Sequence, residues 1–96
     1  MKRLFLLFFI LTLSANLYAA ERIKVKIGGY DFPPFIEWNS GVPSGIMVSL
    51  TNLLNHEQSK YNFVLVETSP NRRYEDLHNK VYDVIFFENI HWGWNK

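Results

Sequence analysis

The chain has 96 residues, a formal net charge of +1, 20% charged and 17% aromatic residues, and no cysteine. Disulfides and thiolate metal sites are therefore excluded. A nucleic-acid partner is not expected either, because it would require a basic cluster, and Arg72-Arg73 is the one adjacent basic pair after residue 3.

Residues 1–20 have the three-part pattern of a secretory signal peptide. Lys2 and Arg3 precede an apolar run, 4–13, and the small residues Ala19 and Ala20 follow it. The run is shorter than the roughly 20 residues that span a bilayer. We therefore expect cleavage, export and no stable membrane insertion, the alternative being a retained anchor. The mature part, 21–96, keeps eight of the ten Lys and Arg and all nine Asp and Glu, so its net charge is −1.

The first predicted element of the mature part is a strand over residues 23–27. Apolar residues alternate there with Lys24 and Lys26, which predicts one buried face. Gly28-Gly29 is expected to end this strand. Because Pro33-Pro34 cannot donate ladder hydrogen bonds, we predict that residues 30–43 form a loop.

A helix is predicted next, from an N-cap at Ser44 to about His56. Its expected buried stripe consists of Ile46, Met47, Leu50, Leu53 and Leu54, with Ser49, Asn52 and Asn55 pointing away. Residues 61–66 form the second predicted strand. Their nearly continuous apolar run indicates a strand covered on both faces, as in a parallel sheet.

Ser69-Pro70 indicates the start of a second helix that reaches Lys80, with Tyr74 and Leu77 facing inward. Residues 81–87 form the third predicted strand, and Asp83 is expected near solvent at its start. Strands and helices alternate as β-α-β-α-β. This order predicts an α/β fold with three parallel strands, two helices and right-handed crossovers.

Ligands of open parallel sheets bind beyond the carboxyl ends of the strands. That rule brings together segments 28–38, 67–73 and 88–94. The candidate ligand-binding residues in them are Tyr30, Asp31, Phe32, Trp38, Asn71, Arg72, Glu88, Asn89 and Trp92. Aromatic faces attract an ammonium group and helix N-termini attract a carboxylate, so this edge suits a small polar or zwitterionic solute.

Structural roles are open for several of these residues. Phe32 and Phe35 could pack the loop against the first helix, Trp92 could cover the end of the sheet, and at least one residue of Arg72-Arg73 is expected to be solvated. No metal, cofactor or catalytic group is expected. Glu88 and His91 have metal-ligand spacing but no third ligand, and the serines lack a nucleophile-elbow context.

Three segments resemble the bacterial extracellular solute-binding proteins of family 3, the periplasmic receptors for polar amino acids. They are IGGYDFPPF at 27–35, Gly41 with SGIMVSL at 44–50, and KVYDVIFF at 80–87, and the resemblance covers residues 23 to about 94. It implies a type 2 periplasmic-binding fold, a two-lobed clamp that passes its ligand to an inner-membrane ABC transporter. Phe32 matches the aromatic that stacks on the ligand, and the segment after Phe87 matches backbone that contacts it.

Two departures from that family concern charge. Ser49 stands where the family usually carries Asp, and no arginine follows Arg73 to clamp a ligand carboxylate. By the resemblance, residues 21–96 are the N-terminal part of a first lobe, truncated before the second, and we expect weak or no binding of free amino acids. Two alternatives stay open. One is the N-terminal part of an enzyme on the same scaffold, a lytic transglycosylase or dehydratase, and the other is a small secreted interaction protein that pairs through an exposed sheet edge.

Overall fold

The computed structural model describes residues 21–94, so the predicted signal peptide lies outside the described residues. The elements are β1 (Ile23–Gly29), β2 (Glu37–Asn39), β3 (Val42–Ser44), α2 (Ile46–Glu57), β4 (Tyr61–Glu67), α3 (Arg73–His78) and β5 (Val84–Ile85). Neither α2 nor α3 has the length and apolarity of a membrane span.

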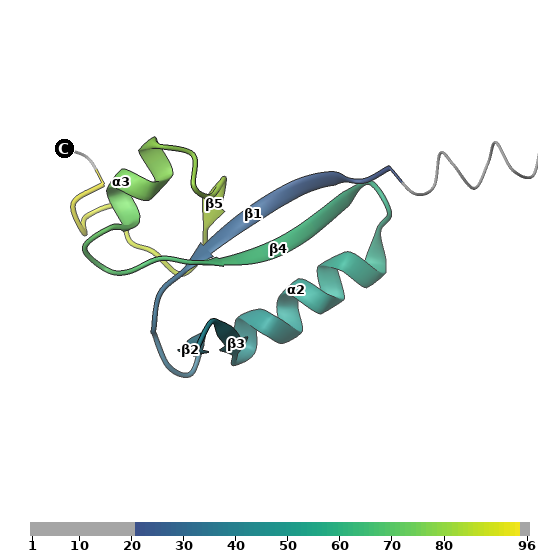
Figure 1. Ribbon diagram of the computed structural model, residues 1–96, viewed down its shortest axis with the longest axis horizontal. Coiled ribbons are helices and arrows are strands. Elements are labelled where there is room, and N and C mark those ends of the chain that lie inside the picture. The colour runs from purple at the N-terminus through teal and green to yellow at the C-terminus, as the bar shows by residue number, and fades with distance from the viewer. Residues whose placement is uncertain (1–20, 95–96) are drawn as a thin grey trace, which may run out of the picture.

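The main sheet has three parallel strands in the order β4-β1-β5. Residues of β1 and β4 pair one to one from Ile23 with Tyr61 to Gly29 with Glu67, whereas β5 pairs with β1 only through Val84 and Ile85. The helix α2 lies along one face of the sheet, and α3 lies on the other side near the carboxyl ends of the strands (Figure 1). The predicted α/β class, with three parallel strands and two helices, is therefore confirmed.

The core lies between β1 and α2. Ile27 of β1 is fully buried against Ile36 and Met47, and partly buried side chains surround these three. That surrounding set is Phe32, Trp38, Leu50, Phe63, Leu65 and Val84. Burial of apolar side chains stabilises the fold by roughly 25 cal/mol per Å². The loop after β1 thus contributes to the same core as the helix.

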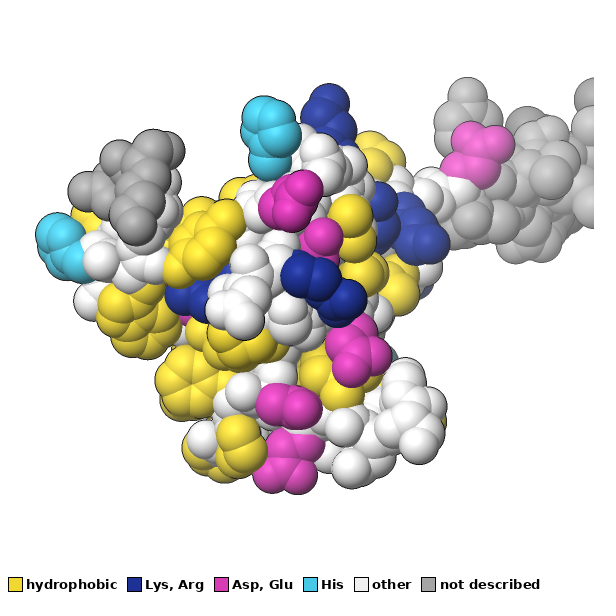
Figure 2. All heavy atoms as spheres, turned by 60° about the vertical axis from the view of Figure 1, so that its left-hand side comes forward, with side chains coloured by type: hydrophobic (Ala, Val, Ile, Leu, Met, Phe, Trp, Pro, Cys, Tyr) yellow, Lys and Arg dark blue, Asp and Glu magenta, His cyan; other side chains and the backbone are white. Residues whose placement is uncertain are grey.

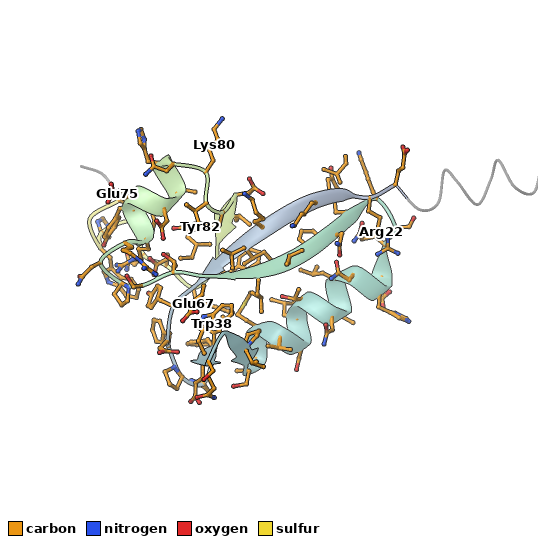
Figure 3. All side chains as sticks on the ribbon, in the orientation of Figure 1. Arg22, Trp38, Glu67, Glu75, Lys80 and Tyr82 are labelled. Carbon is orange, nitrogen blue, oxygen red and sulfur yellow. The ribbon has the colours of Figure 1, made fainter. Side chains whose placement is uncertain are left out.

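The pair Gly28-Gly29 ends β1, as the sequence predicted, but both glycines still belong to the strand, which therefore extends two residues beyond the predicted 23–27. A Cβ on Gly28 would come within 2.6 Å of the ring of Tyr82, and a Cβ on Gly29 within 2.5 Å of the terminal methyl of Ile36. Tyr82 is 1% exposed and lies between α3 and β1 (Figure 3). The two glycines therefore let large side chains pack directly on the backbone from the two faces of the strand.

The prediction of a loop over residues 30–43 is wrong in part, because its second half forms a β-hairpin with Ser44. Strand β2 pairs antiparallel with β3, from Glu37 with Ser44 to Asn39 with Val42. Short strands containing Pro43 give little periodic signal in the sequence, and proline is tolerated there because the hairpin is separate from the main sheet.

Ser44 is the last residue of β3 and not the N-cap of α2. The N-cap is Gly45, with a φ of 109° and no side-chain hydrogen bond. The amides of Ile46 and Met47 donate instead to the carbonyls of Pro34 (3.2 Å) and Phe35 (2.8 Å). A Cβ on Gly45 would lie within 3.0 Å of both carbonyl oxygens, so glycine allows the loop to cap this helix.

The buried stripe of α2 also differs from the prediction. Met47 and Thr51 are buried, whereas Ile46 and Leu53 are 48% and 55% exposed. Thr51 satisfies its hydroxyl by donating to the carbonyl of Met47 at 2.7 Å, which is why a polar residue is tolerated in the stripe. Asn55, expected to point away, bonds to the backbone of Phe63.

Strand β4 extends one residue beyond the predicted 61–66, but none of its residues is fully buried. Residues 63–66, which alternate between the two faces, are all partly buried, so both faces are covered only in part. The strand lies at the outside of the sheet, where it has a neighbour on one side, β1. The continuous apolar run of β4 therefore does not mean that the strand lies in the centre of the sheet.

The second helix and third strand are shorter than predicted. Ser69 and Pro70 belong to a turn before α3, in which the Ser69 hydroxyl accepts the amide of Arg72 at 3.1 Å. The helix ends at His78, and β5 comprises two of the seven predicted residues. Before β5, the amide of the exposed Asp83 donates to the carbonyl of Lys26, and the Asp83 carboxylate accepts the amide of Lys26, both at 2.8 Å. The carboxylate thus takes the place of a backbone carbonyl in the strand pairing.

Candidate ligand-binding site

A small hollow of about 20 Å³ lies at the carboxyl ends of β1 and β5. It is lined by Gly28, Gly29, Tyr30, Phe32, Phe35, Ile36, Met47, Ile85, Phe86 and Phe87. Because β4 and β5 flank β1 on opposite sides, the strand order reverses here. This reversal is where open α/β sheets bind ligands.

Aromatic rings form the outer wall of the hollow. Phe35 and Phe87 stack with centroids 4.4 Å apart, and Phe32 meets Phe35 edge to face at 5.3 Å. Trp92 lies further out, 6.5 Å from Phe32, and both Trp92 and Phe87 are 44% exposed. Apolar side chains gather at this end of the molecule (Figure 2). The wall therefore offers ring faces to a solute.

Behind the aromatic wall, Arg73 and Glu88 form a buried ion pair. Arg73 Nε donates to Glu88 Oε1 at 2.6 Å, and the two side chains are 10% and 8% exposed. Tyr30 donates its hydroxyl to Glu88 Oε2 at 2.6 Å, and the indole of Trp94 donates to Oε1 at 3.1 Å. Both carboxylate oxygens are therefore occupied by protein donors.

The guanidinium of Arg73 is buried to about the same extent as the carboxylate of Glu88. It also donates to the carbonyl of Pro70 and to the hydroxyl of Tyr74. The rings of Tyr74, Tyr30 and Trp94 lie 4.5, 5.1 and 6.0 Å from it, so cation–π attraction adds to the ion pair. The pair therefore holds together the end of β1, α3 and the segment after β5.

Two tyrosines near the pair have raised pKa values. Burial first, and then the hydrogen bond to Glu88, raise the pKa of Tyr30 to about 12. Burial, followed by the charge of Asp76, raises the pKa of Tyr82 to about 12. The Tyr82 hydroxyl donates to the carbonyl of Arg73, which fixes the start of α3 above β1. Both phenols are neutral at physiological pH.

Of the residues predicted from the sequence, Tyr30, Phe32, Glu88 and Trp92 meet at this edge. Tyr30 and Phe32 line the hollow, Trp92 extends its wall, and Glu88 lies behind it, bonded to Arg73. The edge that the sequence indicated is thus built mainly from these residues.

The other predicted residues lie elsewhere or are engaged. Asp31 accepts the amide of Trp38 at 2.7 Å, and the indole of Trp38 donates to the carbonyl of Gly29 at 2.9 Å. Asn71 and Arg72 are exposed, with Arg72 Nε 4.0 Å from Asp76. Asn89 is exposed and accepts the amide of His91 at 2.9 Å. Asp31, Trp38 and Asn89 thus bond to the backbone at this edge, whereas Asn71 and Arg72 face solvent.

The sequence placed both Arg72 and Arg73 at this edge but selected Arg72 as the binding residue, whereas Arg73 is the one that the site encloses. The spacing could have indicated Arg73, because it lies four residues before the inward-facing Leu77 and so shares its helix face. Arg72 shares a face with the partly solvated Asp76 instead. Phe35 and Phe87 were also missed as a stacked pair, because their contact joins two distant loops.

The chemistry of the hollow is mainly apolar. Its lining residues carry no charge. The first amides of α2 are already bonded to loop carbonyls, so they are not available to bind the carboxylate of a solute. Among residues 21–94 no group of three or more His, Asp or Glu is placed to hold a metal ion. The hollow has room for about one water molecule, so a solute would contact the aromatic rings at its mouth, with polar groups facing water.

Comparison of the chain with protein-family models, with curated proteins and with solved structures gave no match.

Proposed function

We propose that the chain is a solute-binding lobe of the kind found in periplasmic receptors for amino acids, and that it binds a small polar solute at the carboxyl edge of its sheet. The observation that carries this proposal is the position of the hollow. It lies where the strand order reverses between β1 and β5 and is lined by the ends of both strands.

The loop after β1 supports the proposal. It starts at the reversal point, and Phe32 and Phe35 from it form the aromatic wall together with Phe87 from the loop after β5. Segments 27–35 and 80–87, which carry the resemblance to the receptors, thus supply both sides of one hollow. This agreement favours a binding role over a purely structural one.

The lining defines which part of a solute binds. An apolar side chain of an amino acid would lie against the rings at the mouth of the small hollow, and its ammonium group would gain from the exposed rings of Phe87 and Trp92. Since Arg73 is held by Glu88, the solute carboxylate lies outside the hollow. We therefore expect weak binding, with a dissociation constant of about 1 mM or higher.

The signal-like pattern of residues 1–20 supports export to the periplasm, where such a receptor would pass its solute to an inner-membrane transporter. N-terminal sequencing of the protein recovered from cell fractions tests this part. A periplasmic protein that begins at residue 20 or 21 is expected. A cytoplasmic protein that still begins at Met1 would contradict it.

Titration calorimetry of the recovered protein with a panel of amino acids tests the binding itself. Weak binding of members with apolar or aromatic side chains is expected, and Phe87→Ser should abolish it by removing half of the stacked pair. Ile90→Ser is the matched control, because Ile90 is 71% exposed and does not line the hollow. No binding of any member, or equal losses in both variants, would contradict the proposal.

A further inference from the structure

The outer edge of β4 is partly covered by the side chains of Asn55, in α2, and Gln58, its C-cap. On the inner side, the amide of Ile23 donates to Lys60 O and the amide of Thr68 donates to Gly29 O, both at 2.9 Å. Even-numbered residues of this strand therefore present their backbone groups to β1. Because successive residues of a strand alternate, Tyr61, Phe63, Leu65 and Glu67 present theirs outward.

Asn55 occupies the outward groups of Phe63. Its side-chain amide donates to Phe63 O at 2.9 Å and its side-chain carbonyl accepts the Phe63 amide at 2.7 Å. Gln58 does the same for Tyr61, at 2.8 and 2.7 Å. Two reciprocal N–H···O bonds to one residue are the pattern that a facing residue of an antiparallel strand would make. The two side chains thus stand where a neighbouring strand would lie.

The protein itself holds both side chains in place. Gln58 Nε2 also donates to the carbonyl of Leu54 at 3.0 Å, which fixes it at the end of α2. Arg22 donates to the backbone carbonyl of Asn55 at 3.2 Å. The end of α2 lies beside the start of β4, and Arg22 and Glu67 mark the two ends of the strand region (Figure 3). The cover therefore applies to the first half of β4.

We propose that Asn55 and Gln58 protect this edge, so that a second copy of the chain cannot add a strand to it. An uncovered edge is a template for pairing with another chain, and proteins block such edges with lysine, proline or bulges. The seven residues of β4, YNFVLVE, contain no lysine or proline, and they pair with β1 without a bulge. The two amides supply the protection that the strand sequence lacks.

The second copy is the expected occupant because β4 can pair with itself. In an antiparallel pair of two β4 strands with Val64 on the two-fold axis, Tyr61 faces Glu67 of the other copy and Phe63 faces Leu65. All four outward residues then gain partners. With the amides in place, Leu65 and Glu67 alone are open, too short a stretch for a stable pair.

Removal of both amides tests the proposal. The variant Asn55→Ala with Gln58→Ala is compared by sedimentation velocity with wild type and with Asn52→Ala, all recovered from cells. Asn52 is exposed on the same helix and serves as the matched control. Wild type and control should be monomeric, and the double variant should dimerise as its concentration rises. A folded double variant that stays monomeric throughout would contradict the proposal.

Amide hydrogen exchange gives a residue-level test. In wild type, Tyr61 and Phe63 should exchange about tenfold or more slowly than Leu65 and Glu67. In a dilute solution of the double variant, Tyr61 and Phe63 should lose this protection. In a concentrated solution, dimer formation should protect all four outward residues. Equal exchange at all four in wild type would contradict the cover.

Single variants decide the case if the double variant does not fold. Asn55→Ala should expose the amide of Phe63 alone, and Gln58→Ala that of Tyr61 alone. Unchanged protection in either would contradict the proposal. The edge is therefore an interaction surface that the native chain keeps closed over its first half.

Discussion

Arg73 Nε lies 2.6 Å from Glu88 Oε1, and this contact joins the first residue of α3 to the segment that follows β5. Removing two charges from water is costly, and the loss is offset here because protein groups bond to both partners. Tyr30 and Trp94 donate to Glu88, and Tyr74 accepts from Arg73. The pair anchors the structure behind the aromatic wall.

Glu88→Gln should therefore destabilise the protein strongly. It leaves the Arg73 guanidinium buried without a counter-charge, and breaking such a pair costs about 3 to 5 kcal/mol. Glu75→Gln, an exposed change on α3, should alter the free energy of unfolding by about 0.5 kcal/mol or less. Urea unfolding measures both. Equal effects of the two substitutions on the free energy of unfolding would show that the buried ion pair is no more important to stability than an exposed carboxylate.

The contact between Gly29 and Ile36 gives a second prediction. Gly29→Ala places a Cβ 2.5 Å from the terminal methyl of Ile36 and should cost about 1 to 3 kcal/mol. Ile36→Val removes that methyl, so the double variant should be less destabilised than the sum of the two single changes by more than about 0.5 kcal/mol. A strictly additive double variant in the same urea assay would be inconsistent with this contact.

Alkaline pH should weaken the fold through Tyr30 and Tyr82. The pKa of each is raised from 10.0 to about 12, so the folded state holds its phenol proton more tightly than the unfolded state. The resulting stabilisation is complete below pH 10 and is lost as the pH rises from 10 to about 12. Tyrosinate absorbance and circular dichroism should show late ionisation coupled to unfolding.

Tyr82→Phe provides the control for that titration. It keeps the ring on Gly28 but removes the titrating hydroxyl, so its stability should fall less steeply above pH 10 than that of wild type. If all tyrosines ionised together near pH 10 without loss of structure, burial of these phenols would be disproved.

The parts of the fold that were predictable are those with a local signal. The alternation at 23–27, the helical run in 46–57 and the apolar run from 61 give β1, α2 and β4 nearly at their observed bounds. The end of β1 was predicted two residues too early, because the sequence does not show that Tyr82 and Ile36 pack against the two glycines while these still pair in the strand. Those contacts are not local in the sequence.

The candidate site was predictable as a location but not in its bonding. The carboxyl-edge rule brought Tyr30, Phe32 and Glu88 together, as observed. It could not show that Glu88 would be paired with Arg73, because that choice depends on how α3 is rotated against β1. The stacking of Phe35 on Phe87 likewise depends on two loop conformations.

The most direct test of solute binding at the carboxyl edge is chemical-shift mapping of the isotope-labelled protein recovered from cells, titrated with amino acids. Binding should shift the amides of Gly28, Gly29, Ile85 and Phe87, which line the hollow, and leave Gly41 in the hairpin turn unchanged. Shifts confined to residues remote from the hollow, or no shift with any amino acid at about 100 mM, far above a dissociation constant of about 1 mM, would contradict a solute site there.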